Sequence, residues 1–275
     1  MHTLDYLRQD KLPHIWCDGC TNGTVTSAII RAIDNSGIDR DKTVIVSGIG
    51  CSSRAPGYMD FDTLHTAHGR ALAFATGVKM ANPELNVIII SGDGDAAAIG
   101  GNHLIHACRR NIDMTLVVMN NSIYGMTSGQ HSPLTPPGAL ATTATYGNVD
   151  RSFDFAELGK GAGATYVARS TAYHVMQLQK YIEAGIANKG FSMIEAVTTC
   201  HTYYGRKNGL GGPVEMLESL KNNSEFLREG ISEYTKPYIL GEFVKKTERE
   251  YTEAYDTEIR AKAMEDAKAK GGAQS

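Results

Sequence analysis

The segment that most constrains the fold is a run of four β-branched residues that leads directly into a glycine-rich polar turn. The run covers residues 87–90, and the turn Ser-Gly-Asp-Gly-Asp covers residues 91–95. Consecutive β-branched residues without polar alternation are typical of a strand inside a parallel sheet, where both faces are buried. The alanine-rich residues 96–99 can then open a helix. The order of strand, turn and helix predicts one βαβ unit.

Further runs of strand-forming residues predict neighbouring strands of the same sheet. They cover residues 43–46, 115–119, 165–168 and 193–197, with a helical stretch at residues 172–184. Strands that alternate with helices favour an α/β fold, in which a parallel sheet carries helices on both faces.

A helix is predicted after Cys20, because small or apolar residues recur there with the spacing of one helix face. These residues are Val25, Ala28, Ile29, Ala32 and Ile33. The pattern ends at the Asn-Ser-Gly sequence of residues 35–37, which is a suitable C-terminal stop.

The composition changes twice along the rest of the chain. Residues 127–150 are rich in Gly, Pro, Thr and Ser, which predicts a long loop that serves function or binds a partner. Acidic, basic and alanine residues alternate over residues 242–270, which favours a solvated helix. We therefore expect a main domain at residues 1–212 and a C-terminal helical extension at residues 213–275.

The composition also limits the partners and the compartment. A net charge of -3 over 275 residues provides no broad basic field, so neither nucleic acid nor an anionic membrane is expected as a partner. Residues 1–11 lack the apolar core of a secretory signal, and the run at 87–90 is far shorter than the ~20 residues of a membrane span. We expect a cytoplasmic protein, whose five cysteines stay reduced and are free to bind metal.

Polar residues follow two of the predicted strands at the point where each ends. Gly92, Asp93 and Gly94 follow one strand, and Asn120 and Asn121 follow the next. The carboxyl ends of parallel strands form the edge where α/β proteins bind ligands, and glycine lets the backbone approach a phosphate. Carboxylate and amide oxygens suit Mg²⁺, which also takes diphosphate oxygens. A strand and helix joined by a capped turn is the alternative interpretation.

Four of the cysteines occupy suggestive positions. Cys17 and Cys20 form a C-x2-C pair, Cys51 stands in a Gly-Cys-Ser sequence, and Cys200 follows the last predicted strand. Such a pair fits zinc, a redox pair or an iron–sulfur cluster, and the spacing does not choose among them. Each cysteine alone is more often a small core residue. Cys108, in a predicted helix, is the odd one.

Together the two motifs resemble the β subunits of thiamine-dependent 2-oxoacid:ferredoxin oxidoreductases, in particular the 2-oxoglutarate type. The resemblance covers about residues 13–210 and rests on Gly-Asp-Gly, on Asn-Asn after a spacer of 25 residues, and on the order of the four cysteines. One departure is Asp18-Gly19 inside the first pair, where many family members have a proline. Ligation needs only the thiolates, so this departure leaves the expected cluster intact.

The resemblance implies three cofactors and their ligands. Mg²⁺ would be held by Asp93, Asn121 and the Ile123 carbonyl, and one [4Fe–4S] cluster by Cys17, Cys20, Cys51 and Cys200. The residues expected around thiamine diphosphate are Gly50, Cys51, Ser52, Ser53, His68, Gly92, Asp93, Gly94, Asp95, Asn121, Ile123, Tyr124, Gly125 and Met126. A packed or helix-capping histidine is the alternative for His68.

The resemblance also implies an activity that needs a second chain. Thiamine diphosphate attacks the ketone of a 2-oxoacid, CO₂ leaves, electrons pass through the cluster to ferredoxin, and coenzyme A takes the acyl group. Reductive carboxylation of an acyl-CoA is the reverse of this reaction. The glutamate that activates the cofactor belongs to a pyrimidine-binding domain that we do not find here, so an alpha or fused gamma-alpha subunit must supply it.

Arg54 is the candidate residue for the substrate. A guanidinium suits a carboxylate, and in the family a basic residue at this position looks toward the substrate. The alternative is a solvated surface arginine.

Two other functions remain open at this point. The chain could be half of a non-redox thiamine-dependent 2-oxoacid decarboxylase, with incidental cysteines. It could also be a zinc-stapled binding module with a fortuitous Gly-Asp-Gly turn. The content of iron, zinc and thiamine separates all three.

Overall fold

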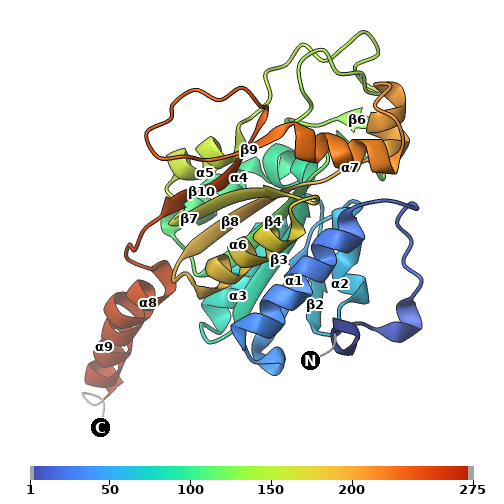
Figure 1. Cartoon of the computed structure of the whole chain (residues 1–275). Helices are drawn as coiled ribbons and strands as arrows, with labels where there is room; N and C mark the ends of the chain where they lie inside the picture. The colour runs from blue at the N-terminus through green and yellow to red at the C-terminus, as the bar shows by residue number, and fades with distance from the viewer. Residues whose placement is uncertain (1–2, 272–275) are drawn as a thin grey trace.

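The five runs that we expected to be strands form five neighbouring strands of an eight-stranded sheet (Figure 1). The computed structural model describes residues 3–271. The strands of this sheet, in spatial order, are β2 (Asp62–His65), β1 (Thr43–Ser47), β3 (Asn86–Gly92), β4 (Met114–Asn120), β8 (Phe191–Val197), β7 (Tyr166–Thr171), β10 (Tyr238–Lys245) and β9 (Ser224–Phe226). A separate antiparallel pair consists of β5 (Ile123–Tyr124) and β6 (Gln130–His131).

Six neighbouring strands of this sheet run parallel to one another, namely β2, β1, β3, β4, β8 and β7. Strand β10 is antiparallel to β7. Successive side chains of β3 point to opposite faces, so Ile88 and Ile90 enter one core whereas Val87 and Ile89 enter the other. Burial on both faces explains why the strand runs contain no polar alternation. The expected α/β fold with a parallel sheet is confirmed.

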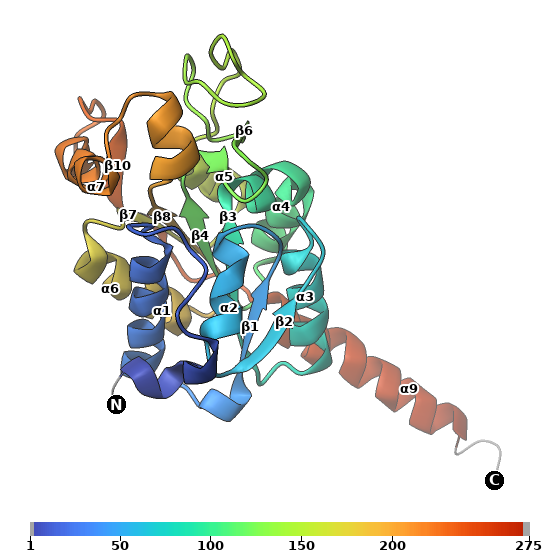
Figure 2. The same cartoon turned by 90° about the vertical axis from the view of Figure 1, so that its right-hand side faces the viewer.

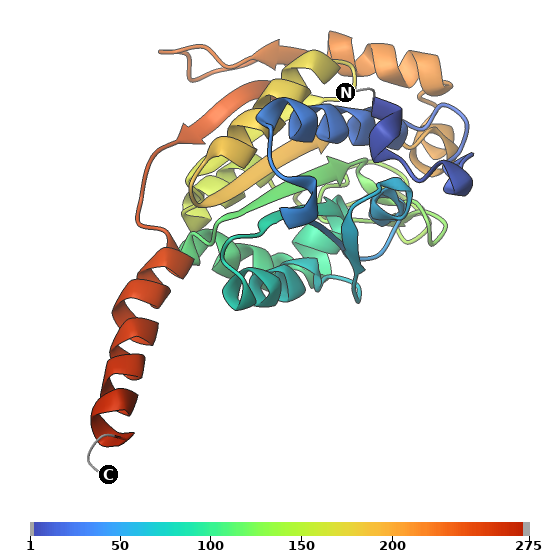
Figure 3. The same cartoon turned by 90° about the horizontal axis from the view of Figure 1, so that it is seen from below.

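Helices cover both faces of the sheet. Figure 3 shows α1 and α6, in blue and yellow, on one side and the teal helices on the other. One face carries α1 (Asn22–Ser36), α2 (Ala55–Tyr58) and α6 (Val175–Ala187), and the other carries α3 (Ala71–Ala81), α4 (Gly101–Arg110) and α5 (Phe155–Ala162). Helix α1 ends where the sequence predicts, because Gly37 adopts a left-handed conformation with φ 63° directly after Ser36.

The expected helix at residues 242–270 is wrong over its first part. Strand β10 covers Tyr238–Lys245 and pairs with β7, and the helical part begins at α8 (Tyr251–Tyr255). Apolar residues explain the difference, since Leu240 is fully buried and Phe243 and Val244 pack against the core. Glu242 and Lys245 are the exposed positions of this strand, which lies between β7 and the outermost strand β9.

The remaining C-terminal elements lie beyond residue 212. Helix α7 (Pro213–Asn222) precedes β9, and a π-helical turn (Asp256–Arg260) joins α8 to α9 (Ala261–Gly271). Figure 2 shows α9 projecting away from the body of the protein. The expected boundary at 212/213 coincides with the start of α7, but β9 and β10 after it extend the same sheet. Within residues 3–271, no helix is both long and apolar enough to cross a membrane.

The order of the strands reverses between β1 and β3. The chain leaves β1 to form β2 on one side and leaves β3 to form β4 on the other side. The two outgoing connections therefore separate and open a crevice at the carboxyl ends of β1 and β3, which is where open α/β sheets bind ligands.

Candidate cofactor and cluster site

A small cavity of about 60 Å³ lies at this crevice. The expected cofactor residues that line it are Gly50, Cys51, Ser52, His68, Gly92, Asp93, Gly94, Asp95, Asn121, Ile123, Tyr124, Gly125 and Met126. Ser53 is the exception, because its side chain is only 1% exposed and does not line this cavity. Ile49, Met119 and Thr127 line it as well and were not expected. The sequence motifs thus meet in one place.

Asp93 is the buried carboxylate of the cavity. Its Oδ2 accepts a hydrogen bond from Ser132 Oγ, and backbone N–H groups of Gly94 and Asn121 also bond to the carboxylate. Burial nevertheless raises the pKa of Asp93 to about 7. A cation beside it would favour the charged form, so the site suits a metal ion chemically. Ser132 was not expected, because nothing near it in the sequence resembles a binding motif.

The turn after β4 presents the amide and carbonyl oxygens that were expected to bind Mg²⁺. Ser122 adopts a positive φ of 62°, and its N–H donates to Asn120 Oδ1 at 3.0 Å. The Ile123 N–H donates to Asn121 Oδ1 at 3.1 Å. Asn120 is held in turn by Glu195, which accepts from Asn120 Nδ2 at 2.7 Å. These bonds fix the turn that brings Asn121 and Ile123 to the cavity.

Asp95 is a structural centre of the crevice. Its Oδ1 accepts from the N–H groups of Gly69 and Ile49 at 2.7 and 3.2 Å and bonds to His68 Nδ1 at 2.6 Å. Its Oδ2 accepts from Ser91 Oγ at 2.5 Å. Asp95 therefore ties the loops after β1 and β2 to the end of β3, and it leaves the Nε2 of His68 available for a ligand.

Gly94 is required by the close approach of Tyr124. The Tyr124 hydroxyl donates to the Gly94 carbonyl at 3.0 Å, and its ring occupies the space that a Cβ at position 94 would need. Burial raises the pKa of Tyr124 to about 12, so the hydroxyl stays a donor. The ring also meets the His68 ring edge-on, with centroids 5.8 Å apart.

A second cavity of about 250 Å³ adjoins the first. All four of the expected cluster ligands line it: Cys17, Cys20, Cys51 and Cys200. The wall between the two cavities, which we call the shared wall, consists of Cys51, Asn121, Gly125 and Met126, because these residues line both. A Cβ on Gly125 would lie 3.5 Å from Cys51 Sγ and 3.6 Å from Cys200 Sγ, which shows how close these thiols are.

The C-x2-C pair is closed by a turn. The Cys20 N–H donates to the Cys17 carbonyl at 2.9 Å, and Gly19 takes a φ of 78°, a value that favours glycine. Burial, with smaller contributions from the neighbouring cysteines, raises the pKa values of Cys20 and Cys51 to about 11. Cys108 is fully buried in α4 and lines neither cavity.

Buried polar groups around the cysteines fit an iron–sulfur cluster. Among the described residues, atoms of four side chains there are buried without a hydrogen-bond partner, and each lies within two positions of a cysteine: Asn22, Ser53, Thr198 and His201. Of these four side chains, His201 lines the cysteine cavity, and the sulfur atoms of a cluster there would accept a hydrogen bond from it. Within residues 3–271, no group of three or more His, Cys, Asp or Glu side chains is placed to hold a single metal ion.

Arg54 lies at the cluster cavity and not at the cofactor cavity. It ends a short 3₁₀ turn (Ser52–Arg54) that follows Cys51, and its side chain is exposed. It lines the second cavity together with the four cysteines. Arg54 therefore lines the cavity of the cysteines and does not line the cavity where the diphosphate is expected.

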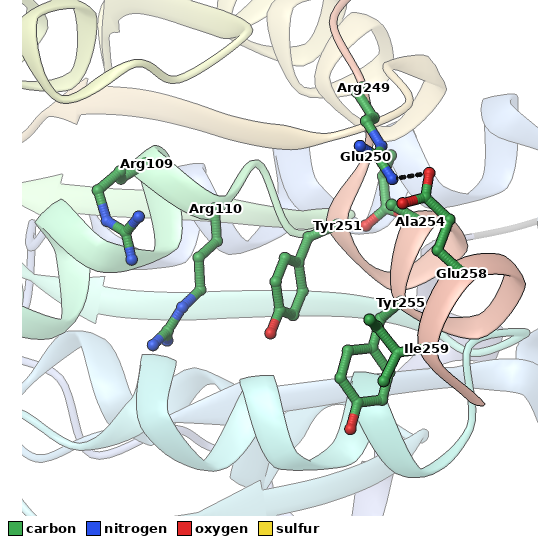
Figure 4. A pocket seen from close by; sticks show the side chains of 9 residues that line it. All are labelled: Arg109, Arg110, Arg249, Glu250, Tyr251, Ala254, Tyr255, Glu258 and Ile259. Atoms are coloured by element: carbon green, nitrogen blue, oxygen red, sulfur yellow. Dashed lines mark hydrogen bonds and ion pairs between the residues drawn. The ribbon is translucent and has the colours of Figure 1, made fainter. Parts of the chain in front are cut away.

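A larger groove of about 520 Å³ lies elsewhere, between the end of α4 and the C-terminal helix (Figure 4). Helix α4 ends just before β4 begins, so this groove lies near the amino ends of the strands, whereas the crevice lies at their carboxyl ends. Its charges are mostly engaged: Arg249 pairs with Glu258, and Glu250 accepts from the N–H groups of Thr252 and Glu253. The groove is bigger than the crevice, but none of the cofactor motifs reaches it.

Comparison with known proteins agrees with this geometry. Residues 48–196 match the family described as "Thiamine pyrophosphate enzyme, C-terminal TPP binding domain". The chain is 55% identical to the 2-oxoglutarate synthase subunit KorB of Methanothermobacter marburgensis, over 87% of this chain and 86% of that one. It is 43% identical to the 2-oxoacid:ferredoxin oxidoreductase subunit beta of Saccharolobus solfataricus, over 68% of this chain and 62% of that one.

A solved structure shares the fold. The chain superposes with a TM-score of 0.86 and 31% identity on a chain of the 2-oxoglutarate:ferredoxin oxidoreductase from Magnetococcus marinus. The match covers 96% of this chain and 91% of that chain. That structure contains 2-oxoglutarate, coenzyme A and succinyl-CoA.

Proposed function

Because the chain belongs to the family of 2-oxoacid:ferredoxin oxidoreductase β subunits, we propose that it is the cofactor-carrying half of an enzyme acting on 2-oxoglutarate. The enzyme would form succinyl-CoA and CO₂ and reduce ferredoxin, or run in reverse as a reductive carboxylase. The meeting of the Gly-Asp-Gly turn, the Asn-Asn turn and four cysteines at two adjoining cavities carries the proposal.

The crevice would hold thiamine diphosphate through Mg²⁺. When bound, thiamine diphosphate supplies the nucleophile for the ketone and stores the electrons after CO₂ leaves. Asp93, the Asn121 side chain and the Ile123 carbonyl would bind the ion, with Ser132 holding the Asp93 carboxylate in place. Gly92 and Gly94 leave room for the diphosphate, and His68 Nε2 would reach one of its oxygens.

The second cavity would hold one [4Fe–4S] cluster on Cys17, Cys20, Cys51 and Cys200. The shared wall supports this proposal, because the same residues line both cavities and the two proposed cofactors would therefore be neighbours. None of the five cysteines forms a disulfide, which suits the reducing cytoplasm where we expect the protein to act.

A partner chain is required for two reasons. A cavity of about 60 Å³ is far smaller than the roughly 300 Å³ or more that encloses a ligand of this size. The activating glutamate must also come from a pyrimidine-binding domain. We propose an alpha or fused gamma-alpha subunit that covers the crevice, supplies the glutamate and contributes to coenzyme A binding.

The substrate assignment rests on relatives and on one arginine. The relative from Methanothermobacter marburgensis is named 2-oxoglutarate synthase, and the solved neighbour binds 2-oxoglutarate. Arg54 is exposed at the mouth of the cluster cavity, where a guanidinium suits the second carboxylate of a dicarboxylic 2-oxoacid.

The deciding experiment is the cofactor content and activity of the anaerobically co-purified complex. We expect iron, sulfide, Mg²⁺ and thiamine together, and 2-oxoglutarate-dependent, coenzyme-A-dependent reduction of ferredoxin. Thiamine without iron would instead indicate a non-redox decarboxylase subunit, and zinc without iron or thiamine would indicate a binding module.

A matched pair of variants sharpens this experiment. Cys200→Ser should remove iron and ferredoxin reduction, whereas Cys108→Ser should leave both, because Cys108 lies inside α4 away from the cavities. Full iron content in the Cys200→Ser complex would contradict the ligand assignment.

A further inference from the structure

The four cysteines come from three segments of the chain that are far apart in sequence. Hydrogen bonds at or next to the cysteines join these segments directly. Trp16 Nε1 donates to the Cys51 carbonyl at 2.7 Å, and the Thr199 N–H donates to Thr21 Oγ1 at 2.9 Å. Each bond is made by a residue next to a cysteine, or by the cysteine itself. The segment of Cys17 and Cys20 is thereby tied to both of the others.

Thr21 uses its hydroxyl in an unusual way for its position. It is the N-cap residue of α1, where a threonine oxygen ordinarily accepts a hydrogen bond from the first turn of its own helix. Here the side chain makes no capping bond. Its oxygen instead accepts from Thr199, which is 178 residues away, and both residues are buried. The hydroxyl therefore serves the contact between segments and not the start of the helix.

Trp16 is held rigidly enough to act in the same way. Its ring is 7% exposed and meets the Tyr58 ring edge-on, with centroids 5.2 Å apart. The Tyr58 hydroxyl accepts from the Ile15 N–H at 2.9 Å. Since Tyr58 ends the short helix α2 that follows Cys51, these contacts clamp the residues before Cys17 onto the Cys51 segment.

We propose that Thr21 and Trp16 are positioning residues that hold the three cysteine-bearing segments together before the cluster is inserted and while it is retained. This inference rests on the cluster assigned above. If the segments are already joined, cluster binding does not have to bring them together. The entropy cost of closing the long loops between them then does not reduce the affinity for the cluster. Neither residue is itself a ligand.

The test compares Thr21→Val, Thr21→Ser and Trp16→Phe in the anaerobic complex. Thr26→Val is the matched control, because Thr26 is also buried in α1 but bonds only to the Asn22 carbonyl of its own helix. Iron and sulfide content and the rate of iron release to a chelator are measured, together with the thermal midpoint of each apo-protein.

We expect Thr21→Val and Trp16→Phe to release iron about tenfold faster than wild type, the effect of one lost hydrogen bond. Thr21→Ser, which keeps the hydroxyl, should restore slow release, and Thr26→Val should match wild type. Release from Thr21→Val at the wild-type rate would overturn the inference, and so would equally fast release from Thr26→Val. A wild-type complex without iron and sulfide would instead overturn the proposed function, so the two failures are distinguishable.

Discussion

Asp93 combines a stability cost with a binding role. It is 2% exposed, and burial raises its pKa to about 7, so the carboxylate is partly charged at neutral pH in an environment that disfavours charge. A group whose pKa is raised on folding lowers stability as the pH rises through that pKa. Hydrogen bonds from Ser132 and from backbone N–H groups offset only part of this cost. Binding sites often retain such costs for the sake of function.

Asp93→Asn should therefore separate stability from cofactor binding. We expect thiamine diphosphate affinity in the complex to fall at least about tenfold, because a charged Mg²⁺ ligand is lost. The apo-protein should unfold at the same or a higher temperature, since the buried charge is gone. Calorimetric titration with and without Mg²⁺ checks the first result, and thermal denaturation checks the second. Unchanged affinity and an unchanged Mg²⁺ requirement would contradict the assignment.

Arg54→Ala tests the substrate assignment. Loss of a charged hydrogen bond of about 2 kcal/mol should raise KM for 2-oxoglutarate on the order of thirtyfold, with a far smaller effect on pyruvate. Steady-state kinetics of the complex with both substrates give the comparison. Equal losses would mean that Arg54 grips the carboxylate common to both substrates or supports the loop. A wild-type complex that prefers pyruvate would refute the dicarboxylate assignment alone.

At the scale of residues, the sequence predicts functional residues that belong to short local motifs. Asp93, Asn121 and the C-x2-C pair could be found in this way. Ser132 could not, because its partner Asp93 lies 39 residues away and serine is common in loops. Thr21 was hidden for the same reason. Pairings of this kind depend on how the sheet brings distant segments together, and that information is absent from any local pattern.

At the scale of elements, the long loop at residues 127–150 is anchored to the cofactor turn. Thr135 Oγ1 donates to the Ser122 carbonyl at 2.5 Å and accepts from the Ser132 N–H at 2.8 Å. Asn148 Nδ2 donates to the Thr135 carbonyl at 2.8 Å. A loop without regular structure over most of its length is therefore tied to Ser122, which lies between two of the proposed Mg²⁺ ligands, Asn121 and Ile123.

Thr135→Val should loosen this loop while leaving the sheet intact. The fully buried hydroxyl has two partners, so its removal should speed hydrogen exchange of the loop amides by about tenfold or more. Thr142→Val is the matched control, because its exposed hydroxyl bonds only to the Ser128 carbonyl of the same loop. Hydrogen exchange followed by mass spectrometry measures both. Equal protection in the two variants would show that Thr135 is not the anchor.

The central strands were predictable, but the edges of the sheet were not. Strands β3 and β4 are buried on both faces, and their uninterrupted apolar runs announce this directly. The edge strand β2 has no fully buried residue, and β10, which lies next to the edge strand β9, mixes charged with apolar residues. Such patterns resemble polar loops or solvated helices, so the sequence does not predict β2 and favours a helix over the last part of β10.

At the scale of the whole molecule, both cavities lie at the carboxyl ends of the parallel strands, and this end of the sheet is open. The cofactor cavity adjoins the cluster cavity, whereas the groove beside the C-terminal helix lies at the opposite end. A second chain that covers the crevice could therefore complete the thiamine site without disturbing the sheet.

The isolated chain should accordingly be inactive on its own. We expect no exchange of labelled CO₂ into 2-oxoglutarate by the chain alone, and exchange once the partner subunit is added, because the proposed function assigns the activating glutamate to the partner. Circular dichroism of the isolated chain serves as the control that it is folded. Exchange by the folded chain alone would show that it needs no partner for this step.

The shared wall would couple damage at the proposed iron–sulfur cluster to damage at the proposed thiamine diphosphate site. Oxygen that strips the iron of the proposed cluster would leave Cys51 as a partly buried thiol whose pKa is raised to about 11, and Gly125, which lies close to that sulfur, would lose a fixed neighbour. Damage that begins at the metal would then spread to the thiamine side of the wall. Repair after exposure to air would have an obligatory order, with iron and sulfide restored before added thiamine diphosphate could be of use.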